Sequence, residues 1–225
     1  MELPTTSYAI LGMLSLRPWT AYELTRQLRR SLDLCWPKAE SVLYDEPKRL
    51  VRLGLATARR EPAGRRTRTV YEITGRGRAA LADWMATHPT PPRFESEPML
   101  RLLYADQGSK QDALRAVAAL RDWTTAQATG FLDQAEGYLD DGGPFPERLH
   151  IIALFGTYYL DLLEATRRWT ERAEAEIDGW PRTDGLGMTA PTRELLEDLA
   201  ARLRRLAEAD GEGRVPAAGP AAAEA

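Results

Sequence analysis

Cysteine and histidine are scarce in this 225-residue sequence, which holds one cysteine, Cys35, and two histidines, His88 and His150. Internal disulfides are therefore excluded, and a structural zinc site of thiolates and imidazoles cannot be assembled. We expect no metal and no cofactor. Cys35 stands between two large apolar residues, which is more typical of a small buried hydrophobic residue than of a thiol sensor.

Long apolar runs are also missing. No stretch approaches the roughly 18 residues that a membrane span needs. The first residues lack the basic start and the small-residue cleavage site of a signal peptide. These features predict a cytoplasmic protein. With 44% hydrophobic and 28% charged residues, the chain has an ordinary globular composition and room for one large domain or two small ones.

Catalytic patterns are lacking as well. Gly75–Gly77 and Gly185–Gly187 have neither the third glycine nor the preceding strand of a dinucleotide-binding loop. Asp140 and Asp141 are adjacent in sequence, so they cannot face each other as an acid–base pair. No nucleophile, base and orienting group occur at a meaningful spacing, and an enzyme is therefore disfavoured.

The net charge of −3 hides an asymmetry between the two parts of the chain. Residues 1–88 carry 15 Lys and Arg against 9 Asp and Glu, a net charge of +6, whereas residues 89–225 carry −9. A concentrated positive field indicates a polyanionic partner such as nucleic acid. Solvated charge that clusters by chance is the alternative interpretation.

Three helices are predicted in the N-terminal part, over about 5–16, 21–32 and 37–53. Thr20 and Glu23 have the spacing of a capping box that opens the second helix, and Pro37 suits the first position of the third. Three short helices in about fifty residues are typical of a helix-turn-helix core.

A β-wing is predicted next. Residues 55–61 and 69–73 read as two short strands around a turn that carries Arg65, Arg66 and Arg68. A turn needs only one or two polar residues, so three guanidinium groups favour contact with DNA over a merely solvated hairpin. A helix then leads to a proline-rich linker at 87–93, and we predict that the DNA-binding domain spans residues 1–88.

A helix-turn-helix with a wing reads duplex DNA: its third helix enters the major groove, and the wing reaches the flanking phosphates or the minor groove. Tyr44 could instead pack beneath the wing. The predicted DNA-contacting residues are Lys38, Ser41, Tyr44, Lys48, Arg49, Arg52, Arg65, Arg66 and Arg68.

The remaining residues are helical by pattern, and we predict a helical dimerisation domain over 89–208 and a disordered tail over 209–225. Positions between 149 and 177 step by three and four, which is the spacing of a coiled-coil seam, although this seam is only partly apolar. The predicted dimerisation residues are Leu149, Ile152, Tyr159, Leu163, Ile177, Leu195, Leu199 and Leu203. The aromatic residues of this part are most consistent with packing; alternatively, some line an effector cavity, the candidates being Trp123, Phe155, Tyr158 and Trp169.

Several short motifs, in order and spacing, resemble the PadR family of bacterial transcriptional regulators. They are SYAILGML at 7–14, YEL at 22–24, LY at 43–44, KRL at 48–50, GL at 54–55, YEIT at 71–74 and GRAAL at 77–81. The resemblance covers residues 5–88. It implies a homodimeric winged-helix regulator, usually a repressor, which binds double-stranded DNA and is often released by a small molecule. The aromatic candidates named above suggest a small apolar or aromatic effector.

One stretch departs from the family pattern. Many relatives have a proline directly after the tyrosine of the third helix, whereas here the order is Tyr44, Asp45, Glu46, Pro47. Pro47 has no N–H to donate, so we expect the helix to kink or loosen there. Phosphate would repel the two carboxylates, which we expect to point away from the DNA backbone or towards a cytosine amine.

Taken together, the patterns predict a mainly α protein with an N-terminal winged helix-turn-helix, a small two-stranded β-wing and a C-terminal helical dimerisation domain. A MarR-like regulator is the nearest alternative, but those proteins usually place a dimerisation helix before the DNA-binding core, and here the core starts within ten residues of Met1. A helical adaptor that binds only protein would explain the seam and leave the basic wing unexplained. DNA affinity separates these interpretations.

Overall fold

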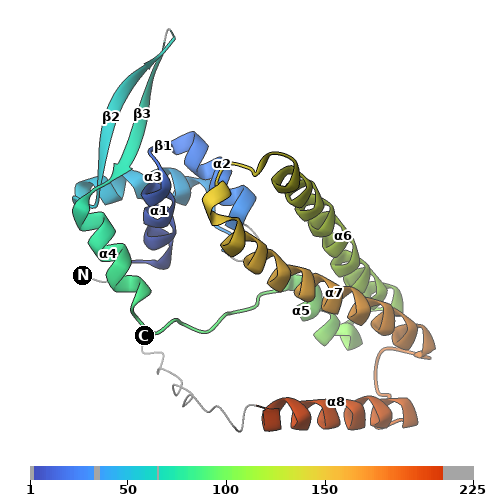
Figure 1. Ribbon diagram of the computed structural model, residues 1–225. Coiled ribbons are helices and arrows are strands. Elements are labelled where there is room, and N and C mark those ends of the chain that lie inside the picture. The colour runs from blue at the N-terminus through green and yellow to red at the C-terminus, as the bar shows by residue number, and fades with distance from the viewer. Residues whose placement is uncertain (1–2, 33–35, 65, 210–225) are drawn as a thin grey trace. The chain divides into compact units, whose positions relative to one another are not determined.

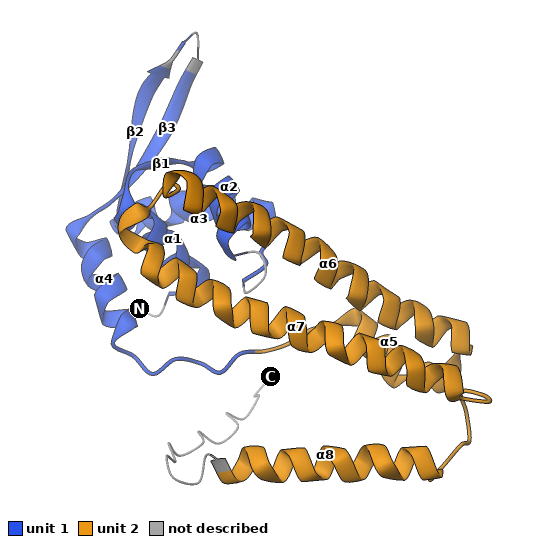
Figure 2. Ribbon diagram, turned by 45° about the vertical axis from the view of Figure 1, so that its right-hand side comes forward, with its two compact units in different colours: residues 1–92 blue, residues 93–225 orange. Residues whose placement is uncertain are grey.

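A computed structural model describes residues 3–32, 36–64 and 66–209 (Figure 1). The chain divides into two compact units, Met1–Pro92 and Arg93–Ala225, coloured blue and orange in Figure 2. Cys35, Arg65 and residues 210–225 of the predicted tail lie outside the described residues. None of the described helices is long and apolar enough to cross a membrane.

Unit 1 contains four helices and three strands in the described residues. In chain order these are α1 (Thr5–Leu16), β1 (Trp19–Thr20), α2 (Ala21–Leu32), α3 (Glu40–Arg52), β2 (Ala56–Ala63), β3 (Arg66–Ile73) and α4 (Gly75–Met85). The first two predicted helices are confirmed. The predicted start of the third at Pro37 is wrong, because Trp36 is held on α1 by an indole N–H that donates to Thr6 Oγ1, and the chain stays non-helical until Glu40.

The capping box at the start of α2 is confirmed. The Thr20 backbone N–H donates to Glu23 Oε2 at 2.9 Å, and the Glu23 N–H donates to Thr20 Oγ1 at 3.2 Å. These bonds satisfy backbone groups that have no partner within the helix. Hydrogen bonds from the Thr20 backbone and hydroxyl also hold the pKa of Glu23 below its ordinary value.

The sheet is antiparallel and has three strands in the order β1-β3-β2. The two long strands, β2 and β3, form the predicted two-stranded wing, which is confirmed. The missed strand, β1, has only two residues, and Trp19 pairs with Tyr71. The hairpin of β2 and β3 runs from the Ala56–Ile73 pair to the Ala63–Arg66 pair and projects from the helices (Figure 1). It turns at Gly64, whose φ of +61° suits glycine.

Thr74 caps α4, as its hydroxyl accepts a hydrogen bond from the Gly77 N–H at 3.0 Å. A side chain at Gly77 would collide with the Leu55 carbonyl, so this position requires the close approach that only glycine allows. The core of unit 1 joins all three helices of the helix-turn-helix to the sheet. Its buried members include Ile10, Leu11, Leu14, Leu24, Leu28, Leu43, Leu50, Val70, Tyr71 and Ile73.

Unit 2 is helical. Its elements are α5 (Glu97–Leu103), the 3-10 turn η1 (Ala105–Gln107), α6 (Lys110–Asp141), the turn η2 (Pro146–Arg148), α7 (Leu149–Gly179) and α8 (Ala190–Ala209). Gly142 ends α6 in the left-handed conformation, with φ of +75°. Helices α6 and α7 then lie side by side and antiparallel (Figure 2).

The predicted seam of α7 is covered by α6 of the same chain. Tyr159, Leu163 and Ile177 are 4%, 3% and 2% exposed. At the far end, Ile177 packs with Ala113 and Val117 of α6. The coiled-coil spacing of α7 therefore reflects the packing of α7 against α6 within one chain. By contrast, each leucine of α8 is at least 47% exposed: Leu195, Leu196, Leu199, Leu203 and Leu206.

Candidate nucleic-acid interface

Helix α3 has one buried face and one exposed face. Leu43, Pro47 and Leu50 point into the core of unit 1 and are buried. The helix is continuous from Glu40 to Arg52 although Pro47 lies inside it. The opposite, exposed face carries polar side chains at a spacing of three or four residues, and we call it the outward face: Ser41, Asp45, Lys48 and Arg52.

Two oppositely charged residues are paired on this outward face. Lys48 Nζ lies 2.8 Å from Asp45 Oδ1. This hydrogen bond lowers the pKa of Asp45 and raises the pKa of Lys48. Both side chains are more than half exposed. Asp45 therefore lies beside the predicted DNA contacts, where the carboxylate can accept from a base amine, while Glu46 turns towards α1.

The other predicted residues of this region differ in orientation. Arg52 is exposed and has no ion-pair partner among the described residues, and Tyr44 is half-buried. Arg49 is directed into the protein, where Nη1 lies 2.8 Å from Glu46 Oε1 and 3.2 Å from Ser7 Oγ. Arg49, although predicted to contact DNA, therefore binds protein groups on the inner side of α3.

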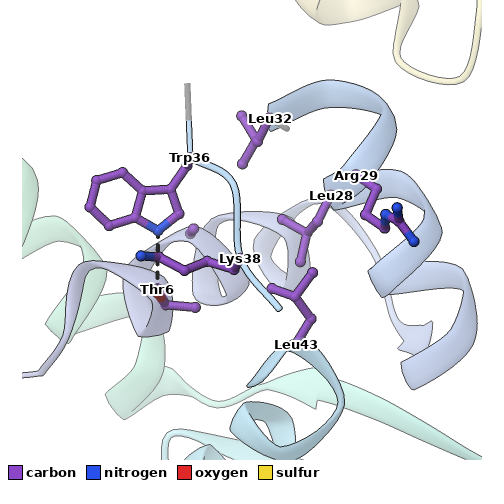
Figure 3. A pocket seen from close by; sticks show the side chains of 8 residues that line it. Thr6, Leu28, Arg29, Leu32, Trp36, Lys38 and Leu43 are labelled. Carbon is purple, nitrogen blue, oxygen red and sulfur yellow. Dashed lines mark hydrogen bonds between the residues drawn. The ribbon is translucent and has the colours of Figure 1, made fainter. Parts of the chain in front are cut away.

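Lys38 precedes α3 and packs against an aromatic ring. Its Nζ lies 4.8 Å from the centre of the Trp36 ring, and the indole N–H donates to Thr6 (Figure 3). The hollow that these side chains line with Leu28 and Leu43 leaves only about 10 Å³ of free space. Ligand pockets measure roughly 300–1,000 Å³, so this hollow has no room for an effector.

The wing carries more cations than the sequence analysis assigned. Arg59 Nη1 lies 2.6 Å from Glu61 Oε1, and Arg68 Nη2 lies 3.1 Å from Glu61 Oε2. Arg60 is exposed on the other face of β2 and forms no ion pair with any described residue. The sequence-based prediction placed DNA contacts only at and after the turn and so missed Arg59 and Arg60. The available signal was two adjacent arginines in a strand, which project to opposite faces.

The two remaining predicted wing residues are Arg65 and Arg66. Arg66 is the first residue of β3, and Arg65 lies outside the described residues. Residues 89–92 hold no charged side chain, so the whole net charge of +6 belongs to unit 1. A strongly basic unit that presents a polar helix face and an arginine-bearing hairpin has the charge that a duplex partner requires.

The predicted residues of unit 2 fall into separate groups. Phe155 and Tyr158 make edge contacts with Tyr159, at ring-centre distances of 4.8 Å and 5.2 Å. Trp169 packs instead in the cluster around Ile177. Trp123, the fourth candidate for an effector cavity, is exposed. Of the candidate dimerisation residues, Leu149 and Ile152 are half-buried.

A three-helix core whose third helix presents a polar face, followed by a hairpin with arginines, defines a winged helix-turn-helix domain. Residues 10–83 match the model of the transcriptional regulator PadR-like family. The N-terminal unit is therefore a PadR-like domain, as the sequence motifs predicted. This family is one of transcriptional regulators, which are not enzymes.

Individual proteins support the same assignment. The negative transcriptional regulator PadR of Bacillus subtilis (strain 168) is 32% identical over 108 residues, which cover 47% of this chain and 59% of the relative. The crystal structure of Bacillus subtilis PadR in complex with operator DNA matches with a TM-score of 0.64 and 24% identity, over 77% of this chain and 99% of that one. The same protein in complex with p-coumaric acid matches with a TM-score of 0.57 and 23% identity, over 80% and 100%. At these identities the structures establish likeness of fold.

Proposed function

We propose that this chain is a cytoplasmic transcriptional regulator that binds operator DNA as a homodimer and represses transcription. The observation that carries the proposal is the outward face of α3, with Ser41, Lys48 and Arg52, on a unit of net charge +6 that also bears the arginine wing. The structure of a family relative with operator DNA adds support, since its fold is shared.

The proposed DNA contacts lie on the outward face of α3 and among the arginines of the wing. Helix α3 enters the major groove, where Lys48 and Arg52 reach phosphates or guanine and Ser41 reaches base edges. The wing arginines bind the flanking phosphates or the minor groove, and they are Arg59, Arg60, Arg65, Arg66 and Arg68. Lys38 and Tyr44 remain proposed contacts at the edge of this surface.

The proposed dimer uses a different face from the one that the spacing of α7 suggested. Tyr159, Leu163 and Ile177 are covered by α6 and offer little surface to a second chain. The leucines of α8 form an exposed apolar stripe over a helix of 20 residues, and exposed stripes of this kind mark interfaces. A two-fold dimer would read an inverted repeat with half-sites about 10 bp apart, or a multiple of that.

Repression and release by a small molecule complete the proposal. The curated relative is a negative regulator, and one structural neighbour holds p-coumaric acid. The aromatic side chains around Tyr159 offer ring contacts to an aromatic effector. Such a ligand releases DNA only if it prefers a conformation in which the two DNA-binding units no longer fit the operator.

Footprinting tests the proposal directly. The purified full chain is bound to the DNA upstream of its own gene at about 150 mM salt, with and without p-coumaric acid. Protection of an inverted repeat supports the function, and lost protection on addition of the acid supports the effector. Absence of any protected site, together with equal affinity for every duplex tried, would contradict operator binding.

A further inference from the structure

Three polar side chains join α1 to α3 inside unit 1. Ser7 Oγ donates to Glu46 Oε1, and Arg49 Nη1 donates to both groups, at 2.8 Å to Glu46 and 3.2 Å to Ser7. Ser7 is fully buried, and the side chains of Glu46 and Arg49 are 11% and 34% exposed. We propose that this triad fixes the orientation of α3 on α1, so that Arg49 is a positioning residue and not a DNA contact.

The surroundings of Arg49 favour this role. To reach a phosphate, its guanidinium would have to leave Glu46, whose largely buried carboxylate would then lack its compensating charge. Lys48 stands one residue earlier, about 100° away around the helix, and is exposed on the outward face. Two adjacent cationic residues of α3 thus have different roles. Lys48 faces outward, whereas Arg49 binds Ser7 and Glu46 of the same chain.

The position of the triad on α3 gives it mechanical importance. Pro47 lies between Glu46 and Arg49 and has no N–H to donate to the Leu43 carbonyl, so the helix lacks one internal hydrogen bond at this turn. Glu46 precedes Pro47 and Arg49 follows it, and both side chains are hydrogen-bonded to Ser7 on α1. Ser41 precedes the turn and Arg52 follows it, so the hydrogen bonds of the triad set how the two ends of the outward face lie relative to each other.

Specific recognition depends on this alignment more than non-specific attraction does. Base-edge contacts require correct distances along the whole groove, whereas phosphate attraction tolerates small displacements. Loosening the triad should therefore weaken binding to the operator while leaving attraction to random DNA in place. This inference rests on the proposed function, since it presupposes that α3 reads DNA.

The test compares variants of the full chain on two duplexes, one carrying the footprinted upstream site and one of random sequence and equal length. Glu46→Gln keeps the shape of the side chain and replaces charge-assisted hydrogen bonds by neutral ones. We expect affinity for the upstream duplex to fall by about fivefold. Affinity for the random duplex and the slope of affinity against salt should not change.

A phosphate-binding Arg49 predicts the opposite result. Glu46→Gln would then free a cation and raise affinity for both duplexes, and Arg49→Ala would lower the salt slope by about one unit. Either outcome, or unchanged affinity in Glu46→Gln, overturns the proposal. Lys48→Ala is the control that shows what the loss of one phosphate contact does to the slope.

Two milder variants cover the case in which Glu46→Gln fails to fold, as judged by its melting temperature. Ser7→Ala removes one hydroxyl, and Arg49→Lys keeps the charge but loses the planar fork. Each variant should reduce the ratio of operator affinity to random-duplex affinity without changing the slope of affinity against salt. The double variant should reduce this ratio by less than the product of the two single reductions, because both substitutions act on the same hydrogen-bonded contact. Full retention of the ratio in Arg49→Lys overturns the proposal. If the natural chain binds neither duplex, the proposed function itself is wrong.

Discussion

Glu61 accepts from Arg68 across the wing at 3.1 Å, and its other carboxylate oxygen binds Arg59. One acidic residue thus offsets part of the charge of two arginines at the place where the wing would meet phosphate. Ion pairs on the surface contribute little to stability, so these two pairs matter for how strongly the hairpin attracts DNA and hardly at all for the fold.

The first prediction concerns these ion pairs. Glu61→Gln should release both arginines, raise affinity for duplex DNA and steepen its salt dependence by about one unit. Fluorescence anisotropy of a labelled duplex between 50 and 200 mM salt measures both quantities. Glu72→Gln removes the same charge from the exposed side of β3, where Glu72 forms no ion pair with any described side chain, and is the matched control. Equal behaviour of the two variants would show that Glu61 acts through net charge alone.

The second prediction concerns the outward face of α3. Lys48→Ala removes an exposed cation and should lower duplex affinity while reducing the salt slope by about one unit. The same anisotropy titration applies. Arg167→Ala in unit 2, which breaks an exposed pair with Glu171, is the control and should leave both quantities unchanged. An unaltered slope in Lys48→Ala would remove Lys48 from the DNA contacts.

The third prediction concerns pH and the capping box of α2. The pKa of Glu23 lies below its ordinary value of 4.5 because Thr20 hydrogen-bonds to the carboxylate. A depressed folded pKa adds stability that is complete above the unfolded value and disappears as the pH falls through the folded value.

Glu23→Gln should therefore destabilise the protein by about 1 kcal/mol at pH 7, and the difference should shrink as the pH drops below about 4.5. Urea unfolding of the full chain at several pH values measures it. Glu95→Gln changes an exposed carboxylate and should cost nothing at any of these pH values. A difference between Glu23→Gln and the natural chain that stays constant down to pH 3 would contradict this account.

The fourth prediction concerns assembly. Leu199→Glu with Leu203→Glu places two charges on the exposed stripe of α8 and should convert the proposed dimer to a monomer, as measured by light scattering at micromolar concentration. Operator affinity should fall by about a hundredfold or more, because the two half-sites no longer act together. Leu139→Glu near the end of α6 alters a leucine that is more exposed than either Leu199 or Leu203 and lies on another helix, and it should leave the proposed dimer intact. A monomeric natural chain would refute the dimer.

Local rules predicted much of unit 1. The bounds of α1 follow from apolar spacing, and the start of α2 follows from the hydrogen-bonding groups of Thr20 and Glu23, which lie three residues apart. The start of α3 could not be predicted in this way, because it depends on a contact between Trp36 and Thr6, 30 residues earlier in the chain. Strand β1 has two residues and exists only through its pairing with β3.

Orientation was harder to predict than position. The sequence places Arg49 on α3, the helix that we propose reads DNA, but the side chain binds Glu46 and also Ser7, which lies 42 residues away on another helix. The spacing of α7 likewise indicates that Tyr159 and Ile177 are buried, without saying whether α6 or a second chain covers them. Which residues form a contact surface depends on tertiary packing, and periodicity alone carries no such information.

The burial of the α7 seam against α6 also bears on gene dosage. A subunit whose long helical hairpin is covered by its own chain can fold before it meets a partner, so assembly is a separate, concentration-dependent equilibrium. Below the dissociation constant of the dimer, the amount of dimer rises with the square of the number of chains in the cell. A twofold change in synthesis would then change the amount of DNA-binding species about fourfold, a steeper response to expression level than that of a regulator whose dimer stays associated at every cellular concentration.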